Sequence, residues 1–388
     1  MTPREIEVAP HPVGTLEALA GGGYTLHSAV ADLVDNAIDA GARHVSIQYD
    51  PTAAGTLTIQ DDGQGLTEAG LIQAMQIGTR HGTARAAGDL GRFGTGLKAA
   101  ALYLSRGGRF HVSSAATPGE GAAVRLDTAR MQETGRWLIS VEAAPHLPTG
   151  TTLLIDRPMI ATDSETASAA LQALAAHLRC VFSTHMVRGL TLSVQGRTLE
   201  PWRLCDADLP EMVTLSQRRL GGGRVLITPF ILPTHTDDPM IEGPQGRRAH
   251  AGFHVHRAGR AITLGGWLGL GVGKQHRKAS DRVRLLVEID PGLDQIWRIN
   301  LSKSACTVPD ALRPTLRKLL DDVLERAGKQ RSPRRRAPSR TPSPDDLWVA
   351  GNMIRRDHPL VQQVRDHSGA PDALEQLLVR LEQEGRHG

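Results

Sequence analysis

Carboxylate and amide side chains recur at a regular spacing between Thr25 and Gly41. They are Asp32, Asp35, Asn36 and Asp39, which fall at i, i+3, i+4 and i+7 and therefore share one face of a helix. No Lys or Arg lies in this segment to neutralise that face. A helix face that lies against a metal and phosphates would carry such residues, whereas a solvated polar face on a surface helix would show the same pattern. These residues alone support both interpretations.

The element that positions them is predicted to be one amphipathic helix. Thr25 is suited to cap its start and Gly41 to end it. The apolar residues that recur with three-to-four spacing are Val30, Leu33, Val34, Ala37 and Ile38. The acidic face and this apolar face lie on opposite sides of the helix.

Three glycine-containing motifs follow, and each of them is weak alone. Asp61-Asp62-Gly63-Gln64-Gly65 ends a predicted strand, where the glycines allow a sharp bend against a flat ligand. Gly91-Arg92-Phe93-Gly94-Thr95-Gly96 precedes a predicted helix at Ala99–Leu104, and free N–H groups at such a turn can bind phosphate oxygens. The stretch from Gly78 to Gly91 between them has the small and basic residues expected of a lid. Gly150-Thr151 opens a further predicted strand.

Size and composition bound the class of protein. The chain has 388 residues, 40% of them hydrophobic, which is enough for two packed domains and a tail. We expect a soluble, cytoplasmic protein without membrane association, because no run of about 18 apolar residues occurs and the N-terminus lacks a signal-peptide pattern. Cys180, Cys205 and Cys306 are far apart and odd in number, which argues against a disulfide framework and a paired-cysteine zinc site.

Alternating and helical patterns along the rest of the chain predict an α+β fold. Gly21–Gly23 predict a flexible entry into the first helix, and residues 44–49 and 56–60 predict an antiparallel hairpin. Further strands are predicted at 109–113, 123–126, 137–141, 151–155, 190–194, 224–227, 252–257 and 283–289, and helices at 164–182, from 310, and at 373–382. The predicted domains are residues 1–158 and 159–328, a basic Pro/Ser/Arg linker at 329–345, and a C-terminal helical tail at 346–388.

Positive charge is concentrated in two places. Between Glu242 and Asp281 there is no acidic residue, and a second basic block runs from Lys329 to Arg340. Clustering of this kind favours a nucleic-acid partner, although solvated loops would look the same. The first stretch is the predicted contact with duplex DNA, through Arg247, Arg248, Arg257, Arg260, Lys274, Arg277 and Lys278.

The order of the motifs is specific even though each motif is weak. An acidic helix with Asn36, then Asp61-x-Gly63-x-Gly65, a lid, Gly91-x-x-Gly94-x-Gly96 and Gly150-Thr151 resembles the GHKL ATPase superfamily. Within it, the sequence looks most like the microrchidia (MORC) proteins and their bacterial relatives. The resemblance covers roughly residues 20–158. It implies a Bergerat-type sandwich, a mixed or antiparallel sheet with helices on one face, followed by an αβ transducer-like domain.

The resemblance also implies roles for individual residues around ATP and Mg²⁺. Asn36 matches the magnesium ligand, and the bound ion would balance the acidic face. Asp61 matches the carboxylate that accepts the adenine amino proton, supported by Thr151, while Gly63 and Gly65 leave room for the base. The phosphate-binding turn matches Gly91, Phe93, Gly94, Thr95, Gly96 and Leu97. Lys98 matches a phosphate-side lysine, with a solvated lysine as the alternative.

Two residues match the catalytic positions of the family. Asp32 stands where most hydrolysing members have Glu to polarise the attacking water, and its side chain is shorter by about 1.5 Å. A misplacement of about 1 Å can cost roughly a hundredfold in rate, so we expect slow hydrolysis unless the placement of the helix compensates. Lys303 is the candidate for the transducer lysine that reaches the γ-phosphate, with Lys274 or Lys278 as alternatives.

The resulting hypothesis is a slow ATPase that acts as a nucleotide-gated homodimeric clamp on duplex DNA, in DNA maintenance or defence. The alternatives are a chaperone-like ATPase with protein clients, and a pseudo-ATPase scaffold in which Asp32 is inert. A sensor kinase fits less well, because no helical hairpin with a phosphoacceptor His precedes the ATPase region. The tail from Lys329 to Gly388 is the predicted contact for any protein partner.

Overall fold

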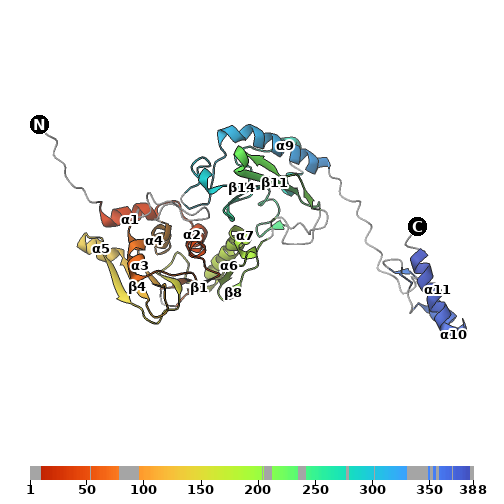
Figure 1. The fold of residues 1–388 in the computed structure, drawn as a ribbon, viewed down its shortest axis with the longest axis horizontal. Coiled ribbons are helices and arrows are strands. Elements are labelled where there is room, and N and C mark those ends of the chain that lie inside the picture. Colours follow the sequence, from red (N-terminus) through yellow and green to blue (C-terminus); the bar gives the residue numbers. More distant parts are fainter. Residues whose placement is uncertain are drawn as a thin grey trace. The chain divides into compact units, whose positions relative to one another are not determined.

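A computed structural model describes most of the chain (Figure 1). The described residues are 10–52, 54–77, 96–202, 204, 212–234, 242–276, 279–300, 302–329, 348–349, 353–354, 358–368 and 370–384. The chain divides into two compact units, Met1–Gln330 and Arg331–Gly388. The larger unit contains two sheets, each with its own apolar core.

The first sheet has eight strands in the order β5-β4-β3-β6-β2-β1-β7-β8. The strands are β1 His44–Asp50, β2 Thr56–Asp61, β3 Arg109–Ala115, β4 Ala122–Asp127, β5 Ile139–Ala143, β6 Gly150–Asp156, β7 Thr191–Val194 and β8 Arg197–Thr198. Neighbouring strands are antiparallel except β1 and β7, which are parallel. The predicted α+β class with a mixed sheet is confirmed.

Alternation of side chains explains why one face of this sheet is covered. In β1, Val45, Ile47 and Tyr49 are buried, while Gln48 and Asp50 are exposed. The buried face shares one core with the helices of this region. These helices are α1 Pro12–Ala20, α2 Leu26–Asp39, α3 Glu68–Met75, α4 Gly96–Leu104, α5 Thr128–Thr134, α6 Ser164–Val181 and α7 Ser183–Val187.

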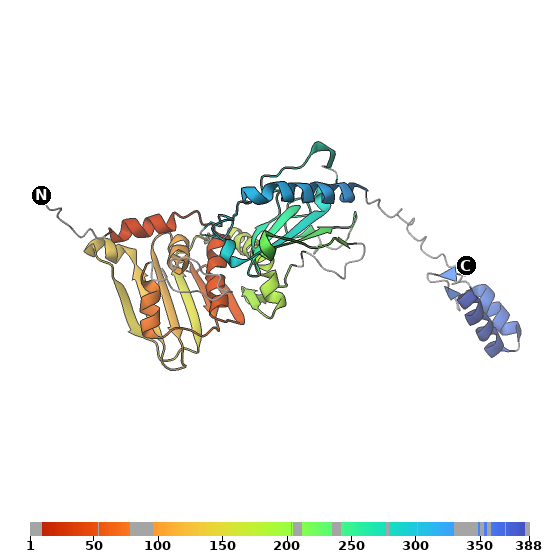
Figure 2. The ribbon, with the colours of Figure 1, turned by 45° about the horizontal axis from the view of Figure 1, so that its top comes forward.

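The second sheet has six strands, in the order β10-β11-β14-β12-β13 with β9 paired to β11. The strands are β9 Val213–Thr214, β10 Arg218–Leu220, β11 Val225–Ile231, β12 Gly252–Arg257, β13 Arg260–Leu264 and β14 Val283–Ile289. Helix α9, Arg313–Lys329, runs along this sheet (Figure 2) and buries Leu316, Leu320 and Leu324 in its core. Short 3₁₀ turns are η1 Gly221–Gly223, η2 Lys274–His276, η3 Ser280–Arg282, η4 Pro291–Leu293 and η5 Asp310–Leu312.

The strand predicted at residues 190–194 does not belong to the second domain. It forms β7, whose Thr191 pairs in parallel with His44 of β1, so the first sheet continues past the boundary predicted near Pro158. Helix α6 packs against α2 and returns the chain to the edge of β1. This long-range pairing leaves no mark in the local pattern. The helix at Pro12–Ala20 is likewise absent from the sequence prediction.

The described residues of the smaller unit form a two-stranded sheet and two helices. They are β15 Trp348–Val349, β16 Met353–Ile354, α10 Pro359–Ser368 and α11 Pro371–Glu384. Ile354, Val361 and Leu378 form a small buried cluster between them. Helix α11 includes the amphipathic helix predicted at 373–382. Among the helices that the structure describes in either unit, none has the length and hydropathy required to cross a bilayer.

Candidate functional site

Helix α2 begins and ends where the sequence predicts. The backbone N–H of Ser28 donates to Thr25 Oγ1 at 3.2 Å, and the backbone N–H of Thr25 donates to Ser28 Oγ at 2.9 Å. This reciprocal capping box fixes the first turn. At the other end Gly41 has a φ of +74°, a left-handed conformation that glycine adopts without strain. The rotation of α2, and thereby the direction of its acidic face, is set by these ends and by its buried apolar residues.

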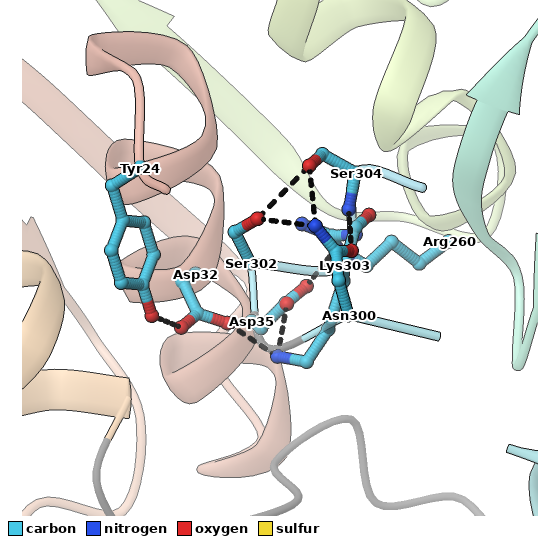
Figure 3. A network of polar contacts seen from close by, with 8 residues as sticks. All are labelled: Tyr24, Asp32, Asp35, Arg260, Asn300, Ser302, Lys303 and Ser304. Atoms are coloured by element: carbon cyan, nitrogen blue, oxygen red, sulfur yellow. Dashed lines mark hydrogen bonds and ion pairs between the residues drawn. The ribbon is translucent and has the colours of Figure 1, made fainter. Parts of the chain in front are cut away.

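The acidic face of α2 is not solvated. Asp32 is 2% exposed and Asp35 is fully buried. The hydroxyl of Tyr24 donates to Asp32 Oδ2 at 2.8 Å, and Lys303 Nζ donates to Asp32 Oδ1 at 2.5 Å (Figure 3). The interpretation as a surface face is therefore wrong for these two residues. Both oxygens of Asp32 accept a hydrogen bond within the chain.

Asp35 is neutralised by two cations from the second region of the larger unit, which is residues 213–329 and contains the second sheet. Lys303 Nζ lies 2.7 Å from Asp35 Oδ2, and Arg260 Nε lies 2.8 Å from Asp35 Oδ1. The expectation that Mg²⁺ at Asn36 balances the acidic face is thus wrong for Asp32 and Asp35, because the chain supplies their counter-charges itself. Sequence spacing could not show this, since Lys303 lies 271 positions from Asp32.

The pKa values reflect this arrangement. Burial opposes the charge on Lys303, but the carboxylates of Asp35 and Asp32 outweigh burial and raise the pKa of the Lys303 ammonium. Burial, together with the charge of Asp32, raises the pKa of Tyr24 well above its usual range. Tyr24 therefore remains a proton donor to Asp32, and Lys303 remains a cation.

A hydrogen-bonded loop presents Lys303 to α2. Asn300 Oδ1 accepts the backbone N–H groups of Ser304 at 2.9 Å and Ala305 at 3.0 Å. The side-chain amide of Asn300 donates to the hydroxyls of Ser302 and Ser304 (Figure 3). Lys303 itself has a φ of +48°, which is strained for a residue with a Cβ. The loop thus holds Lys303 in a conformation that it would not adopt alone.

The predicted adenine-side residues also meet. Asp61 and Thr151 are opposite each other in the pairing of β2 with β6. The backbone N–H of Gly63 donates to Asp61 Oδ1 at 2.9 Å. Burial raises the pKa of Asp61, and the backbone N–H groups of Gly63 and Thr151 partly offset that shift. Thr151 Oγ1 shares a 2.9 Å hydrogen bond with Ser114 Oγ, so Ser114 is a member of this cluster that the sequence did not indicate.

Close packing explains three of the predicted glycines. A Cβ at Gly65, which has a φ of +63°, would lie 1.9 Å from the carbonyl oxygen of Ala115. One at Gly63 would lie 2.9 Å from Ala40, and one at Gly96 would lie 2.9 Å from Asp32 Oδ2. Gly96 therefore brings the start of α4 against the Asp32 carboxylate. For Gly63 and Gly65 the packing is with the protein itself, and their role beside a base stays a prediction.

The remaining residues of the phosphate-side prediction divide into two groups. Gly91, Phe93, Gly94 and Thr95, with the lid from Gly78 to Gly91, lie outside the described residues. Leu97 and Lys98 are in α4. Lys98 is 2% exposed and its Nζ donates to the carbonyl of Ala74 at 2.6 Å, so the alternative of a solvated lysine is wrong. Its role toward phosphate stays a prediction.

Asn36, the neighbour of Asp35 on the acidic face, is half-buried, and its buried Nδ2 atom has no hydrogen-bond partner among the residues that the structure describes. Leaving a buried amide N–H without a hydrogen bond costs free energy. Such a group is expected where a bound ligand accepts the missing hydrogen bond. Asp32 lies against Gly96 where α2 packs on α4, and Asn36 lies one turn further along the same face of α2.

Part of the predicted DNA contact is wrong. Arg257 and Arg260 are buried and bind Asp294 and Asp35 at 2.9 and 2.8 Å. A guanidinium enclosed in this way cannot reach a phosphate backbone. The side chain of Arg247 is 11% exposed and donates to the carbonyls of Pro233 and Thr234. Arg248 and Lys274 are exposed, whereas Arg277 and Lys278 lie outside the described residues.

Comparison with known families identifies the region around this site. Residues 24–153, about a third of the chain, match the family described as histidine kinase-, DNA gyrase B-, and HSP90-like ATPase. This segment is a GHKL-type ATPase domain. The match begins at Tyr24 and ends within β6, so the GHKL domain includes Asp32, Asn36, Asp61 and Thr151. Lys303 and Arg260 reach it from outside the matched segment.

Two curated proteins are similar to part of this chain. ATPase morc-1 of Caenorhabditis elegans is 39% identical over 80 residues, which are 20% of this chain and 9% of that protein. DNA mismatch repair protein MutL of Acidiphilium cryptum (strain JF-5) is 35% identical over 102 residues, which are 26% of this chain and 17% of that protein. The chain thus matches less than a fifth of the length of either relative, and the resemblance to MORC proteins is confirmed as a resemblance only.

Sequence reasoning missed three contributors to this site. Tyr24 immediately precedes the helix cap, Asp35 had no individual role, and Arg260 was expected at a DNA surface. The available signal was that no Lys or Arg lies near Asp32 and Asp35 in the sequence. If these carboxylates are buried, their counter-charges must come from elsewhere in the chain. Nothing in the sequence indicates which cation that partner is.

Proposed function

We propose that this chain binds ATP with Mg²⁺ through its GHKL domain and hydrolyses it slowly, as a nucleotide-gated clamp. The observation that carries the proposal is the position of Asp32, which lies against Gly96 at the start of α4 and is held by Lys303 from the second region. A carboxylate, the last glycine of the predicted phosphate-binding turn and a distant lysine at one point are components that phosphoryl transfer uses.

The residues present suit the nucleotide and the metal. The side-chain oxygen of Asn36 would hold Mg²⁺, which supplies charge neutralisation for the phosphates. Asp61, fixed by the Gly63 N–H, would accept a hydrogen bond from the amino group of adenine, and Thr151 would support that contact. The Nδ2 atom of Asn36, which has no partner among the described residues, is consistent with a ligand that completes the site.

Asp32 is the proposed base and Lys303 the proposed phosphate-side cation. Both oxygens of Asp32 accept a hydrogen bond, one from Tyr24 and one from Lys303. A carboxylate has about four lone-pair sites and an ammonium has three N–H donors, so Asp32 keeps acceptor capacity for water and Lys303 keeps a donor for a phosphate oxygen. The short side chain of Asp32 favours slow turnover.

Phosphate release with purified protein tests the ATPase proposal. Asp32→Asn should lower turnover by about a hundredfold or more, because it removes the base while keeping the size of the side chain. Asp61→Asn should weaken ATP binding by about tenfold through the loss of a charge-assisted hydrogen bond. Asp62→Asn is the matched control, because Asp62 is adjacent but binds His44 at the surface. Unchanged turnover in Asp32→Asn would show that Asp32 is not the base, whereas phosphate release no higher than a protein-free blank in both proteins would leave only a nucleotide-binding scaffold.

The clamp and its client need separate measurements. Light scattering should show dimers with a non-hydrolysable ATP analogue and monomers without it, because a ligand shifts an equilibrium only through its differential affinity for the two states. Equal mass in both conditions would exclude a nucleotide-gated clamp. Stimulation of turnover by duplex DNA supports a DNA client, whereas stimulation by unfolded protein would support a chaperone-like role.

The smaller unit is the proposed contact for a protein partner. Helix α10 exposes Leu360 and Val364, and helix α11 exposes Leu377, Val379 and Leu381. Exposed apolar side chains on adjacent helices are typical of interaction surfaces. Removal of residues 331–388 should leave ATP turnover unchanged and abolish any interaction that depends on this unit.

A further inference from the structure

Arg260 connects the second sheet to the GHKL domain. It is the first residue of β13 and follows a tight turn in which Ala258 and Gly259 have φ values of +49° and +82°. The side chain is 2% exposed. Its Nε lies 2.8 Å from Asp35 Oδ1, and its Nη1 donates to the carbonyl oxygen of Lys303 at 2.6 Å. One planar guanidinium thus holds a carboxylate of α2 and the main chain at Lys303 together.

Asp35 completes this arrangement from the other side. One of its oxygens binds Arg260, and the other accepts Lys303 Nζ at 2.7 Å (Figure 3). Lys303 is therefore held at two points, by Arg260 at its carbonyl and by Asp35 at its ammonium. Neither of these contacts involves Asp32. Lys303 can release Asp32 and remain at the same end of α2.

We propose that Asp35 and Arg260 are positioning residues that hold Lys303 within reach of the γ-phosphate position. This inference rests on the proposed ATPase function and extends it to two residues without a predicted role in nucleotide chemistry. Both act through Lys303, since both are buried and their charged atoms contact each other and Lys303. The backbone of Lys303 is strained, with a φ of +48°. The hydrogen bond from Arg260 to the Lys303 carbonyl stabilises this conformation.

The second sheet provides a matched control. Arg257 lies three residues before Arg260, is 5% exposed, and binds the carboxylate of Asp294 at 2.9 Å. It is a buried, paired arginine of the same hairpin, but its acidic partner lies in the second region rather than on α2. Arg257→Met and Arg260→Met therefore remove the same group from similar surroundings. Only the second change should affect Lys303.

The test compares the affinity for a non-hydrolysable ATP analogue with that for ADP, by calorimetry on the full chain. Arg260→Met and Asp35→Asn should each lower analogue affinity by about tenfold, as expected for a lost charge-assisted hydrogen bond. ADP affinity should stay within about twofold because ADP lacks the γ-phosphate. Arg257→Met should leave both affinities unchanged. Circular dichroism checks that each variant is folded, and Arg260→Lys replaces any Arg260→Met protein that is not, since an ammonium cannot span both partners.

A double-mutant cycle decides whether the effect passes through Lys303. In a Lys303→Met background, Arg260→Met should change neither analogue affinity nor turnover further. A full additional loss in that background, or an equal loss for the analogue and ADP, would overturn the positioning role and leave Arg260 a structural residue. A wild-type chain that does not distinguish the analogue from ADP would instead overturn the proposed function. Wild-type discrimination that survives Arg260→Met overturns only this inference.

Discussion

Two groups of cations from the same stretch of chain, between Glu242 and Asp281, lie in opposite environments. Arg257 and Arg260 are buried and paired with carboxylates, whereas Arg248 and Lys274 are exposed. Strand β12 is buried along its whole length, so a basic residue on it or on its hairpin partner points into the protein. Some residues of one basic stretch can therefore form buried ion pairs inside the protein, while others of the same stretch lie on its surface.

Histidines of the same stretch form a third environment. His250 and His256 are buried, and burial lowers the pKa of each to about 4. Further lowering comes from Arg284 at His250 and from His185 at His256. The buried arginines Arg257 and Arg260 are each paired with a carboxylate. The histidines face other basic groups and are neutral near pH 7.

The largest expected difference between the groups is in stability. Arg257→Met leaves the carboxylate of Asp294 buried without its arginine, which should lower the free energy of unfolding by about 3–5 kcal/mol. Arg248→Met should change it by less than about 0.5 kcal/mol, because Arg248 is exposed. Urea unfolding of both variants measures the difference. Similar losses in the two would show that burial does not separate these groups.

The histidines should make stability depend on pH. An unfolded histidine titrates near pH 6.5 and these folded ones near 4, so between these values the unfolded chain binds protons that the folded chain excludes. The free energy of unfolding should fall as pH drops from 6.5 to 4, by up to about 1.4 kcal/mol per pH unit for each histidine. His256→Phe should flatten this slope by about one proton, measured by urea unfolding at pH 7, 6 and 5. An unchanged slope would mean that His256 is protonated in the fold.

The smallest expected effect is on the exposed cations. Arg248→Ala and Lys274→Ala should each reduce the salt dependence of duplex DNA affinity by about one phosphate contact, without loss of stability. Fluorescence anisotropy at several salt concentrations measures the slope. Arg218→Ala, an exposed arginine on β10 outside this stretch, is the control. Equal slopes in all three variants would argue against a DNA surface at this stretch.

Local elements could be predicted wherever their signals are local. Thr25 and Gly41 mark the ends of α2, and alternation gives β12 and β14 with the bounds that the structure has. The motif order was enough to indicate the GHKL domain, which the family comparison confirms. These predictions rest on interactions between neighbours in sequence or on a pattern of spacing that is preserved in the family.

The contacts that define the site are of another kind. Lys303 could be selected as a candidate from its post-strand loop, but its two carboxylate partners could not, because the distance between them in sequence exceeds 260 residues. In the sequence, Arg260 looks like part of a basic stretch that contacts DNA. In the structure it pairs with Asp35. Its partner depends on how the β12–β13 hairpin meets α2, and side-chain types do not encode that orientation.

The parallel pairing of β1 with β7 has a consequence for dissecting the molecule. Strand β1 has β2 on one side and β7 on the other, and beyond β7 the side-chain amide of Gln195 binds both the N–H and the carbonyl of Tyr49. A fragment that stopped at Pro158 would leave this row of backbone groups open to pair with another copy. Such a fragment should elute as aggregates in size-exclusion chromatography, whereas one that extends past Thr198 keeps the edge covered.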